Sequence, residues 1–378
     1  MSGAIKNGTC FVCLACLFCI FAVYKIFVRM NIVIDEKIPF LREALEAMGH
    51  SVVALPGVRI AAADVSAADA LFVRTRTMCN AALLDGSKVR FIGTATIGYD
   101  HIDAAYCECN GIEWASAAGC NAGAVLQYVQ SVIYSWAKER ECQLQGLSLG
   151  IVGVGEIGSR VAAWARSEGM RLLLNDPPRQ AKEGSGNFVS LADIARECDI
   201  ITFHPTLSRG GDFPSYHLAN EAFLSSLEKC RLLINASRGP VVDNLALLDA
   251  LDDSSLFDTV LDVWENEPEI LLPLLNKVYI ATPHIAGYSA EGKLNATRLV
   301  LEAFAVFSGY DGVLPLPALP VPEPQVIAAP TYADALLQIY TPDVDSKRLK
   351  RSPETFEEQR NNYALRREPS AYKMTIEM

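Results

Sequence analysis

The stretch "GIVGVGEIGSR", residues 150–160, decides the fold of this chain. Its glycines Gly153, Gly155 and Gly158 have the spacing Gly-x-Gly-x-x-Gly, follow the apolar run "LSLGIV" and open a helical pattern. Such glycines permit a tight turn and let the backbone approach a pyrophosphate, whose charge the helix N-terminus attracts. The spacing alone is a weak signal, because any α/β protein can contain a glycine turn.

An acidic residue strengthens the dinucleotide interpretation. Asp176 lies 18 residues beyond Gly158, at the end of the strand-like run "RLLLND". A carboxylate there would accept hydrogen bonds from ribose hydroxyls and repel a 2′-phosphate, which predicts NAD over NADP. Strand, turn, helix and acid together predict an NAD site that also includes Glu156 and Ile157, the residues inside the glycine motif.

Short apolar runs alternate with helical patterns on both sides of this motif. The runs "NIVI", "ALFV" and "RFIG" lie upstream, and "IITFH", "RLLINAS" and "TVLDVW" lie downstream. Residues 121–139 predict one long helix with Asn121 as its N-cap. This alternation is typical of α/β proteins, so we expect two doubly wound parallel-sheet domains joined by that helix.

Three polar residues follow strand-like runs and suggest acid–base chemistry. They are Arg238 in "INASRGPVVDN", Glu267 in "LDVWENEPE" and His284 in "TPHIAGY". Oxidation of a secondary alcohol needs a base near neutrality, which histidine supplies, and a carboxylate can orient that base. Arginine can hold a substrate carboxylate through two hydrogen bonds. Each residue alone has an ordinary structural explanation, but together, downstream of a nucleotide fold, they favour catalysis.

Composition limits the partners. The 378 residues carry 33 Lys and Arg against 44 Asp and Glu, a net charge of −11, which argues against a nucleic-acid surface. A small anionic substrate stays possible, since a few local arginines can bind it. Seven of the eleven cysteines are scattered among apolar or helix-like residues, which is typical of reduced thiols in a cytoplasmic protein.

Residues 1–29 form an apolar extension that precedes the first strand-like run. The uncharged run "CFVCLACLFCIFAVY" is shorter than the roughly 20 residues that span a bilayer. Met30 begins the strand-like "MNIVIDEKIPF", so we expect residues 1–29 to be an over-extended start, with a true membrane anchor as the alternative. The even spacing of Cys10, Cys13, Cys16 and Cys19 suggests an iron–sulfur cluster only weakly, because the intervening residues are bulky and apolar. We expect no metal.

From Met30 to about Gly309 the chain resembles the D-isomer-specific 2-hydroxyacid dehydrogenases. The resemblance rests on the stretches "ALFVRTRT", "FIGTATIGYDHID", "AAGCNAGAVLQYV", "GIVGVGEIG", "INASRGPVVDN", "LDVWENEPE" and "TPHIAGYSAEGK". Within that family, GTAT–DHID, GCNA and HIAGY–EGK resemble the branch that oxidises 4-phospho-D-erythronate in vitamin B6 biosynthesis. The resemblance favours this branch over phosphoglycerate dehydrogenase.

The resemblance implies an architecture. The NAD-binding Rossmann domain would comprise residues 123–284, and a discontinuous, flavodoxin-like substrate domain would comprise residues 30–122 and 285–310. Residues 311–378 would form a small C-terminal dimerisation segment of a homodimer.

The resemblance also assigns roles to residues. Arg238 would bind and polarise the substrate, Glu267 would pair with the base, and His284 would exchange the proton. The implied substrate contacts are Thr75, Thr96 and Tyr288. The implied NAD-site residues, beyond the glycine motif and Asp176, are Thr206, Ala236, Asp262 and Gly287. The group that binds the substrate phosphate stays open, with Arg74 and Arg76 as candidates.

Some positions depart from the family pattern. Thr75 replaces an expected Ser, Gln127 replaces an expected Glu, and "FHPTL" inverts an expected Thr-Pro order, which weakens Thr206. Two alternatives to the main prediction remain: another 2-hydroxyacid dehydrogenase such as phosphoglycerate dehydrogenase, and a non-enzymatic, NAD-sensing corepressor of the same fold. Turnover of a phosphorylated hydroxy acid would separate them.

Overall fold

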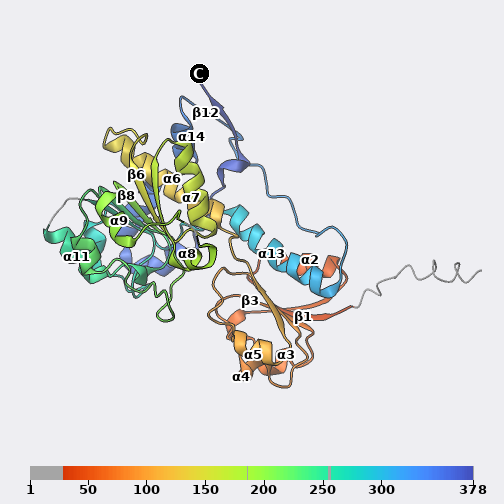
Figure 1. The fold of residues 1–378 in the computed structure, drawn as a ribbon. Helices are drawn as coiled ribbons and strands as arrows, with labels where there is room; N and C mark the ends of the chain where they lie inside the picture. Colours follow the sequence, from red (N-terminus) through yellow and green to blue (C-terminus); the bar gives the residue numbers. More distant parts are fainter. Residues whose placement is uncertain (1–28, 185, 254–256, 378) are drawn as a thin grey trace, which may run out of the picture. The chain divides into compact units, whose positions relative to one another are not determined.

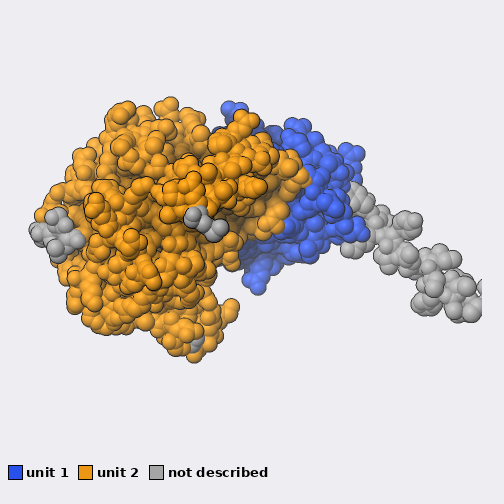
Figure 2. Space-filling view, turned by 90° about the horizontal axis from the view of Figure 1, so that it is seen from above, with its two compact units in different colours: residues 1–93, 100–115, 300–315 blue, residues 94–99, 116–299, 316–378 orange. Residues whose placement is uncertain are grey.

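The computed structural model describes residues 29–184, 186–253 and 257–377. The predictions for the apolar extension concern residues that, except for Arg29, lie outside the described part. The chain divides into two compact units (Figure 2). Unit 1 comprises residues up to Gly93 with Asp100–Ala115 and Val300–Pro315. Unit 2 comprises Thr94–Tyr99, Ser116–Leu299 and Leu316–Met378. The predicted domain boundaries stay a prediction.

The first sheet has five strands in the order β2-β1-β3-β4-β5. Strand β1 pairs in parallel with β2 and with β3. This 2-1-3-4-5 order is the flavodoxin-like one predicted for the substrate domain. The strands are β1 (Asn31–Asp35), β2 (Ser51–Leu55), β3 (Ala70–Val73), β4 (Phe91–Thr94) and β5 (Glu113–Ser116). The associated helices are α2 (Leu41–Ala47), η1 (Gly57–Arg59), α3 (Ala62–Val65), α4 (Ala81–Leu84) and α5 (Ala104–Cys109).

Packing in unit 1 follows from the alternation of side chains along its strands. Leu71 and Val73 belong to a buried cluster with residues of α3, α4 and α5. Phe72 lies between them in the sequence and packs instead against Phe304, with ring centroids 5.4 Å apart. Because successive residues of a strand point to opposite faces, one short apolar run covers both faces of the sheet.

The second sheet has six strands in the order β11-β10-β9-β8-β6-β7. Every pairing within it is parallel. The order reverses at β6, so this sheet is also doubly wound, which confirms the predicted fold class. The strands are β6 (Ser148–Val152), β7 (Arg171–Asn175), β8 (Ile200–Phe203), β9 (Leu232–Asn235), β10 (Asp258–Leu261) and β11 (Ile280–Ala281). The helices are α6 (Ala122–Glu139), α7 (Glu156–Ser167), α8 (Pro177–Glu183), α9 (Leu191–Glu197), α10 (Glu221–Ser225), η2 (Gly239–Val241), α11 (Asn244–Asp253) and α12 (Leu272–Lys277). The next helix, α13 (Ala290–Ser308), passes from unit 2 to unit 1 at Val300.

Helices cover both faces of this sheet (Figure 1). Leu232 and Ile234 of β9 pack in a cluster with residues of α6, α7 and α14 (Tyr332–Ile339). Leu233 packs in a second cluster with residues of α9 to α12. Burial on both faces explains why these strands read as continuous apolar runs instead of alternating ones.

The long helix predicted for residues 121–139 is α6. Asn121 occupies its N-cap position, but its side chain makes no capping hydrogen bond. Its amide lies instead close to Gly287, where a Cβ atom would come within 2.0 Å of Asn121 Nδ2. The predicted N-cap position is therefore confirmed, although the Asn121 side chain does not make the capping hydrogen bond.

The C-terminal segment combines α14 with β12 (Val326–Ala329), α15 (Asp343–Arg351), η3 (Pro353–Thr355), α16 (Phe356–Asn361), η4 (Pro369–Ala371) and β13 (Lys373–Ile376). Strands β12 and β13 pair in parallel and form a small third sheet. The Pro-rich stretch 311–325 forms no helix or strand. Within the described ranges, none of the helices combines the length and the apolar character that a membrane span requires. The dimerisation role of this segment stays a prediction.

Candidate active site

The glycine motif forms the turn between β6 and α7, and the space for a side chain differs among its three glycines. Gly153 has φ +87°, and a Cβ atom there would lie 2.4 Å from the backbone nitrogen of Pro205. A Cβ at Gly158 would lie 2.1 Å from the carbonyl oxygen of Gly153. A Cβ at Gly155 would meet nothing within 4 Å. Packing thus explains the first and third glycines, and the second leaves room for a ligand at the start of α7.

Asp176 lies beside this turn, directly after β7. Its Oδ2 accepts a hydrogen bond from Val154 N at 2.7 Å, and its Oδ1 accepts one from Arg179 N at 3.0 Å as the N-cap of α8. The carboxylate is thereby fixed at the mouth of the glycine turn. Glu156 and Ile157 form the first turn of α7. An open glycine, a helix N-terminus and a fixed acid fit a dinucleotide.

The remaining predicted cofactor residues follow the carboxyl ends of neighbouring strands. Thr206 follows β8, Ala236 follows β9, and Asp262 follows β10. Carboxyl ends of parallel strands meet at one edge of a sheet, which is where ligands bind in doubly wound folds. The three residues therefore lie along the edge that also carries the glycine turn.

Asp262 is buried and organises the loop that contains His284. It accepts hydrogen bonds from Thr282 Oγ1 at 2.6 Å, Ile285 N at 2.8 Å and Ala286 N at 3.0 Å. Burial raises the pKa of the Asp262 carboxyl above its ordinary value, although these hydrogen bonds and the nearby His284 oppose the shift. Its backbone oxygen also accepts from His284 N at 2.7 Å. Asp262 thus fixes the conformation in which the loop presents His284.

His284 and Glu267 form a hydrogen-bonded pair. His284 Nδ1 lies 2.8 Å from Glu267 Oε2, and Glu267 Oε1 accepts from Trp264 N at 2.8 Å. His284 has φ +57°, an uncommon backbone conformation that costs free energy and is often found at functional sites. Of the two ring nitrogens of His284, only Nδ1 has a side-chain partner among the described residues. The geometry therefore leaves Nε2 for proton exchange.

Electrostatics keep the carboxylate of this pair ionised. Burial alone would raise the pKa of Glu267, but four other interactions outweigh it and lower the pKa. They are the hydrogen bond and the charge of His284, the hydrogen bond from Trp264 N and the charge of Arg360. An ionised Glu267 can hold the imidazole in one orientation and stabilise its protonated form.

Arg238 follows β9 and packs beside the loop that carries Glu267. Its Nη1 donates to Ser237 O at 2.8 Å, and its side chain is half-buried. A Cβ at the next residue, Gly239, would lie only 1.9 Å from Trp264 O, so the two loops are in close backbone contact. The sheet order makes β9, β10 and β11 neighbours. Arg238, Glu267 and His284 thus come from adjacent strand ends.

The predicted substrate contacts are distributed over both units. Thr75 lies in unit 1, exposed in the turn after β3, with Arg74 half-buried and Arg76 exposed beside it. Thr96 lies in unit 2 and makes local hydrogen bonds, 2.7 Å to Thr94 Oγ1 and 2.9 Å to Gly98 O. Tyr288 lies in unit 2, four residues beyond His284.

Sequence reasoning missed Arg360, which lies in α16 of the C-terminal segment. Its Nε donates to Tyr288 Oη at 3.3 Å, and its Nη1 lies 4.0 Å from Glu267 Oε2. The only signal in the sequence was the stretch "FEEQRNNYALRRE", whose resemblance to part of the family's C-terminal domain suggested dimerisation and not a site residue.

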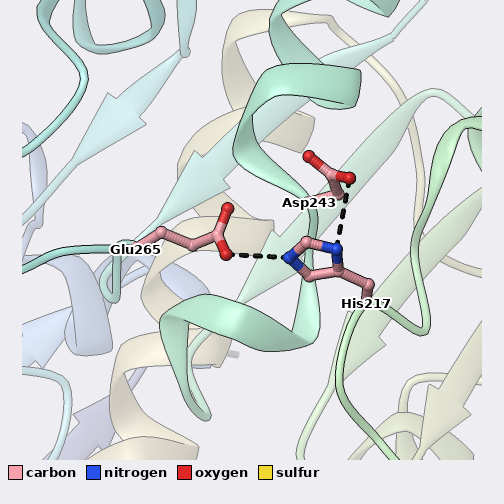
Figure 3. Close-up of side chains that lie close together, drawn as sticks. All are labelled: His217, Asp243 and Glu265. Carbon is pink, nitrogen blue, oxygen red and sulfur yellow. Dashed lines mark hydrogen bonds and ion pairs between the residues drawn. The ribbon is translucent and has the colours of Figure 1, made fainter.

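Unit 2 contains a second histidine–carboxylate cluster, formed by His217, Asp243 and Glu265 (Figure 3). His217 Nε2 lies 2.8 Å from Glu265 Oε1, and Nδ1 lies 3.2 Å from Asp243 Oδ2. This is the one group in the described part of the chain whose composition could hold a metal ion. The two carboxylates lie at different nitrogens of the imidazole ring, so each ring nitrogen already has a carboxylate partner (Figure 3).

Comparisons with known proteins give the family. Residues 121–286 match the family model described as "D-isomer specific 2-hydroxyacid dehydrogenase, NAD binding domain". The chain is 50% identical over 345 residues to erythronate-4-phosphate dehydrogenase of Bacteroides thetaiotaomicron, covering 91% of this chain and 99% of the relative. It is 44% identical to the enzyme of the same name from Edwardsiella ictaluri, covering 91% and 94%.

Solved structures agree with this fold. The D-lactate dehydrogenase of Aquifex aeolicus, complexed with NAD and lactic acid, superposes with a TM-score of 0.56 and 25% identity, covering 74% of this chain and 96% of that one. The NAD-bound 3-phosphoglycerate dehydrogenase of Entamoeba histolytica gives 0.59 and 22%, covering 78% and 99%.

The fold, the glycine turn and the histidine–carboxylate pair define an NAD-dependent dehydrogenase of the D-2-hydroxyacid class. NAD is its cofactor. Within that class, the chain belongs to the erythronate-4-phosphate dehydrogenase family.

Proposed function

We propose that this chain oxidises 4-phospho-D-erythronate at C2 to (R)-3-hydroxy-2-oxo-4-phosphooxybutanoate, a step in pyridoxal 5′-phosphate biosynthesis. The observation that carries the proposal is the pairing of His284 with Glu267 at 2.8 Å in a chain 44 to 50% identical to enzymes of that name. A histidine base held by a carboxylate is what removal of a hydroxyl proton requires.

The protein's residues divide the work at the substrate. NAD, when bound at the glycine turn beside Asp176, supplies the acceptor for the hydrogen at C2. Arg238 holds the C1 carboxylate and polarises the forming carbonyl group. His284 Nε2 takes the proton of the C2 hydroxyl, and Glu267 stabilises the imidazolium that results. In the reverse direction the same imidazolium returns the proton.

The other assignments belong to the same proposal. Thr75, Thr96 and Tyr288 contact the substrate, and Thr206, Ala236, Asp262 and Gly287 line the cofactor site. The enzyme acts in the cytoplasm as a homodimer through its C-terminal segment. Sedimentation velocity of the purified protein tests the oligomeric state.

Substrate choice is the direct test of the proposal. NADH formation is followed with 4-phospho-D-erythronate and 3-phosphoglycerate under identical conditions. We expect kcat/KM for the four-carbon acid to be more than about tenfold higher, equivalent to about 1.4 kcal/mol of transition-state discrimination. Equal values would contradict the proposed substrate, and an absence of turnover with both would favour an NAD-sensing protein.

A further inference from the structure

A phosphorylated hydroxy acid carries two anionic groups at opposite ends, and the proposed function accounts for only one of them. Arg238 holds the carboxylate, but no residue has been assigned to the phosphate. C2 and the phosphorus are four single bonds apart, about 5 Å when extended, given bond lengths near 1.5 Å. The phosphate must therefore meet a cation that is close to His284 but distinct from Arg238.

Arg360 has the required position. Its Nη1 lies 4.0 Å from Glu267 Oε2, the oxygen that binds His284 Nδ1 at 2.8 Å. Its Nε donates to the hydroxyl of Tyr288, which lies on the same loop as His284. The guanidinium thus approaches the catalytic pair and a proposed substrate contact within one unit of the chain.

The contacts of Arg360 leave it able to bind a further anion. Its separations from Glu267 and Glu357 are 4.0 and 3.9 Å, beyond hydrogen-bond distance. A guanidinium has five N–H donors, and the side chain is 29% exposed. Lys293 adds a second positive charge near Tyr288, with its Nζ 4.5 Å from the ring centroid. Together the two cations flank Tyr288, one at its hydroxyl and one over its face.

The sequence around Arg360 is anchored to the His284 loop by buried contacts. Arg366 Nη1 donates to Ile285 O at 2.9 Å, and Ala290 N donates to Arg366 O at 3.0 Å. Ser289 Oγ donates to Glu368 Oε1 at 2.7 Å. These hydrogen bonds fix the C-terminal segment along the loop, so the position of Arg360 is set by the fold.

We infer that Arg360 is a specificity-determining residue that binds the phosphate of the substrate, so that the C-terminal segment contributes directly to the active site. The inference rests on the proposed function. Charge-assisted and bidentate hydrogen bonds between guanidinium and phosphate are among the strongest that side chains make. A shorter or unphosphorylated acid would lose this interaction and retain the one with Arg238.

The test compares substrates with and without the phosphate. Wild type, Arg360→Gln and Arg360→Lys are assayed with 4-phospho-D-erythronate and with D-erythronate, and Arg351→Gln, an exposed arginine of α15, is the matched control. We expect Arg360→Gln to lower kcat/KM for the phosphorylated acid about 100-fold, mainly through KM, and for erythronate less than about threefold. Arg360→Lys should recover part of the loss, and Arg351→Gln should match wild type.

Two further measurements separate phosphate binding by Arg360 from a positioning role for Glu267. Inorganic phosphate should inhibit wild type competitively and Arg360→Gln much more weakly, a readout that does not depend on slow turnover of erythronate. An equal loss on both substrates, together with a displaced acidic limb of the pH profile, would overturn the inference and make Arg360 a positioning residue for Glu267. If wild type prefers 4-phospho-D-erythronate and Arg360→Gln keeps the same preference, the inference about Arg360 is overturned and the proposed function stands. Wild type without activity on that acid would overturn the proposed function as well.

Discussion

Two histidines of unit 2 share a local conformation but differ in their partners. His284 and His217 have φ +57° and +51°, and their side chains are 26% and 24% exposed. His284 is paired through one ring nitrogen, whereas His217 is paired through both. A ring bridged on both sides connects loops and has no nitrogen left for substrate. The number of carboxylates, and not strain or burial, therefore separates a proton carrier from a structural residue.

The connections of the two pairs support this division. Glu265, which binds His217, also accepts from Asn244 N at 2.9 Å, the first residue of α11. His217 N donates to Pro240 O at 2.8 Å. The His217 cluster therefore joins the loop after Arg238 to the loop that carries both Glu265 and Glu267.

The largest effect should come from removing the singly paired histidine. We expect His284→Asn to lower kcat by about 10² to 10⁴, because the variant lacks the ring nitrogen Nε2 that is proposed to accept the hydroxyl proton. Asn tolerates positive φ, so the loop should keep its conformation and the melting temperature should change little. Steady-state kinetics and titration of NAD binding check this, with unchanged cofactor affinity expected. Near-normal kcat would show that the proton carrier is another residue.

Much of this arrangement could be predicted from the sequence, because its signals are local. Glycine spacing, apolar runs and helical periodicity predicted both sheets and α6, and the order of polar strand ends placed Arg238, Glu267 and His284 at one edge. Contacts between distant loops left no comparable signal. His217 meets Asp243 and Glu265 from 26 and 48 residues away, and Arg360 reaches Tyr288 across 72. A single sequence specifies such pairs only through the folded backbone.

An intermediate effect is expected when the charge of the catalytic pair is removed. Glu267→Gln keeps an oxygen for Trp264 N but removes the negative charge that stabilises protonated His284. The protonated base becomes less favourable, so the acidic limb of the kcat/KM profile should move to lower pH, and kcat/KM should fall about 10- to 100-fold. Profiles measured across about pH 5 to 9 reveal the shift.

Glu265→Gln is the matched control for that experiment, since it lies two residues away and faces His217. It should leave the acidic limb in place. A shift of equal size in both variants would mean that the two carboxylates act through general electrostatics and that the division between the two histidines is wrong.

The smallest catalytic effect should come from the doubly paired histidine. His217→Gln loses the contacts of the ring nitrogens with Asp243 and Glu265 and leaves two partly buried carboxylates near each other. We expect the free energy of unfolding to fall by about 1 to 3 kcal/mol, with kcat reduced less than about tenfold. Urea denaturation measures the free energy of unfolding, and saturating-substrate kinetics measure kcat.

The double variant His217→Gln, Glu265→Gln should be destabilised by less than the sum of the single variants, because the two residues share one interaction. Additive losses would contradict the bridging role. EDTA and Zn²⁺ test whether the cluster instead holds a metal ion. If it does, the melting temperature of wild type should fall with EDTA and recover with Zn²⁺, whereas that of His217→Gln should not respond.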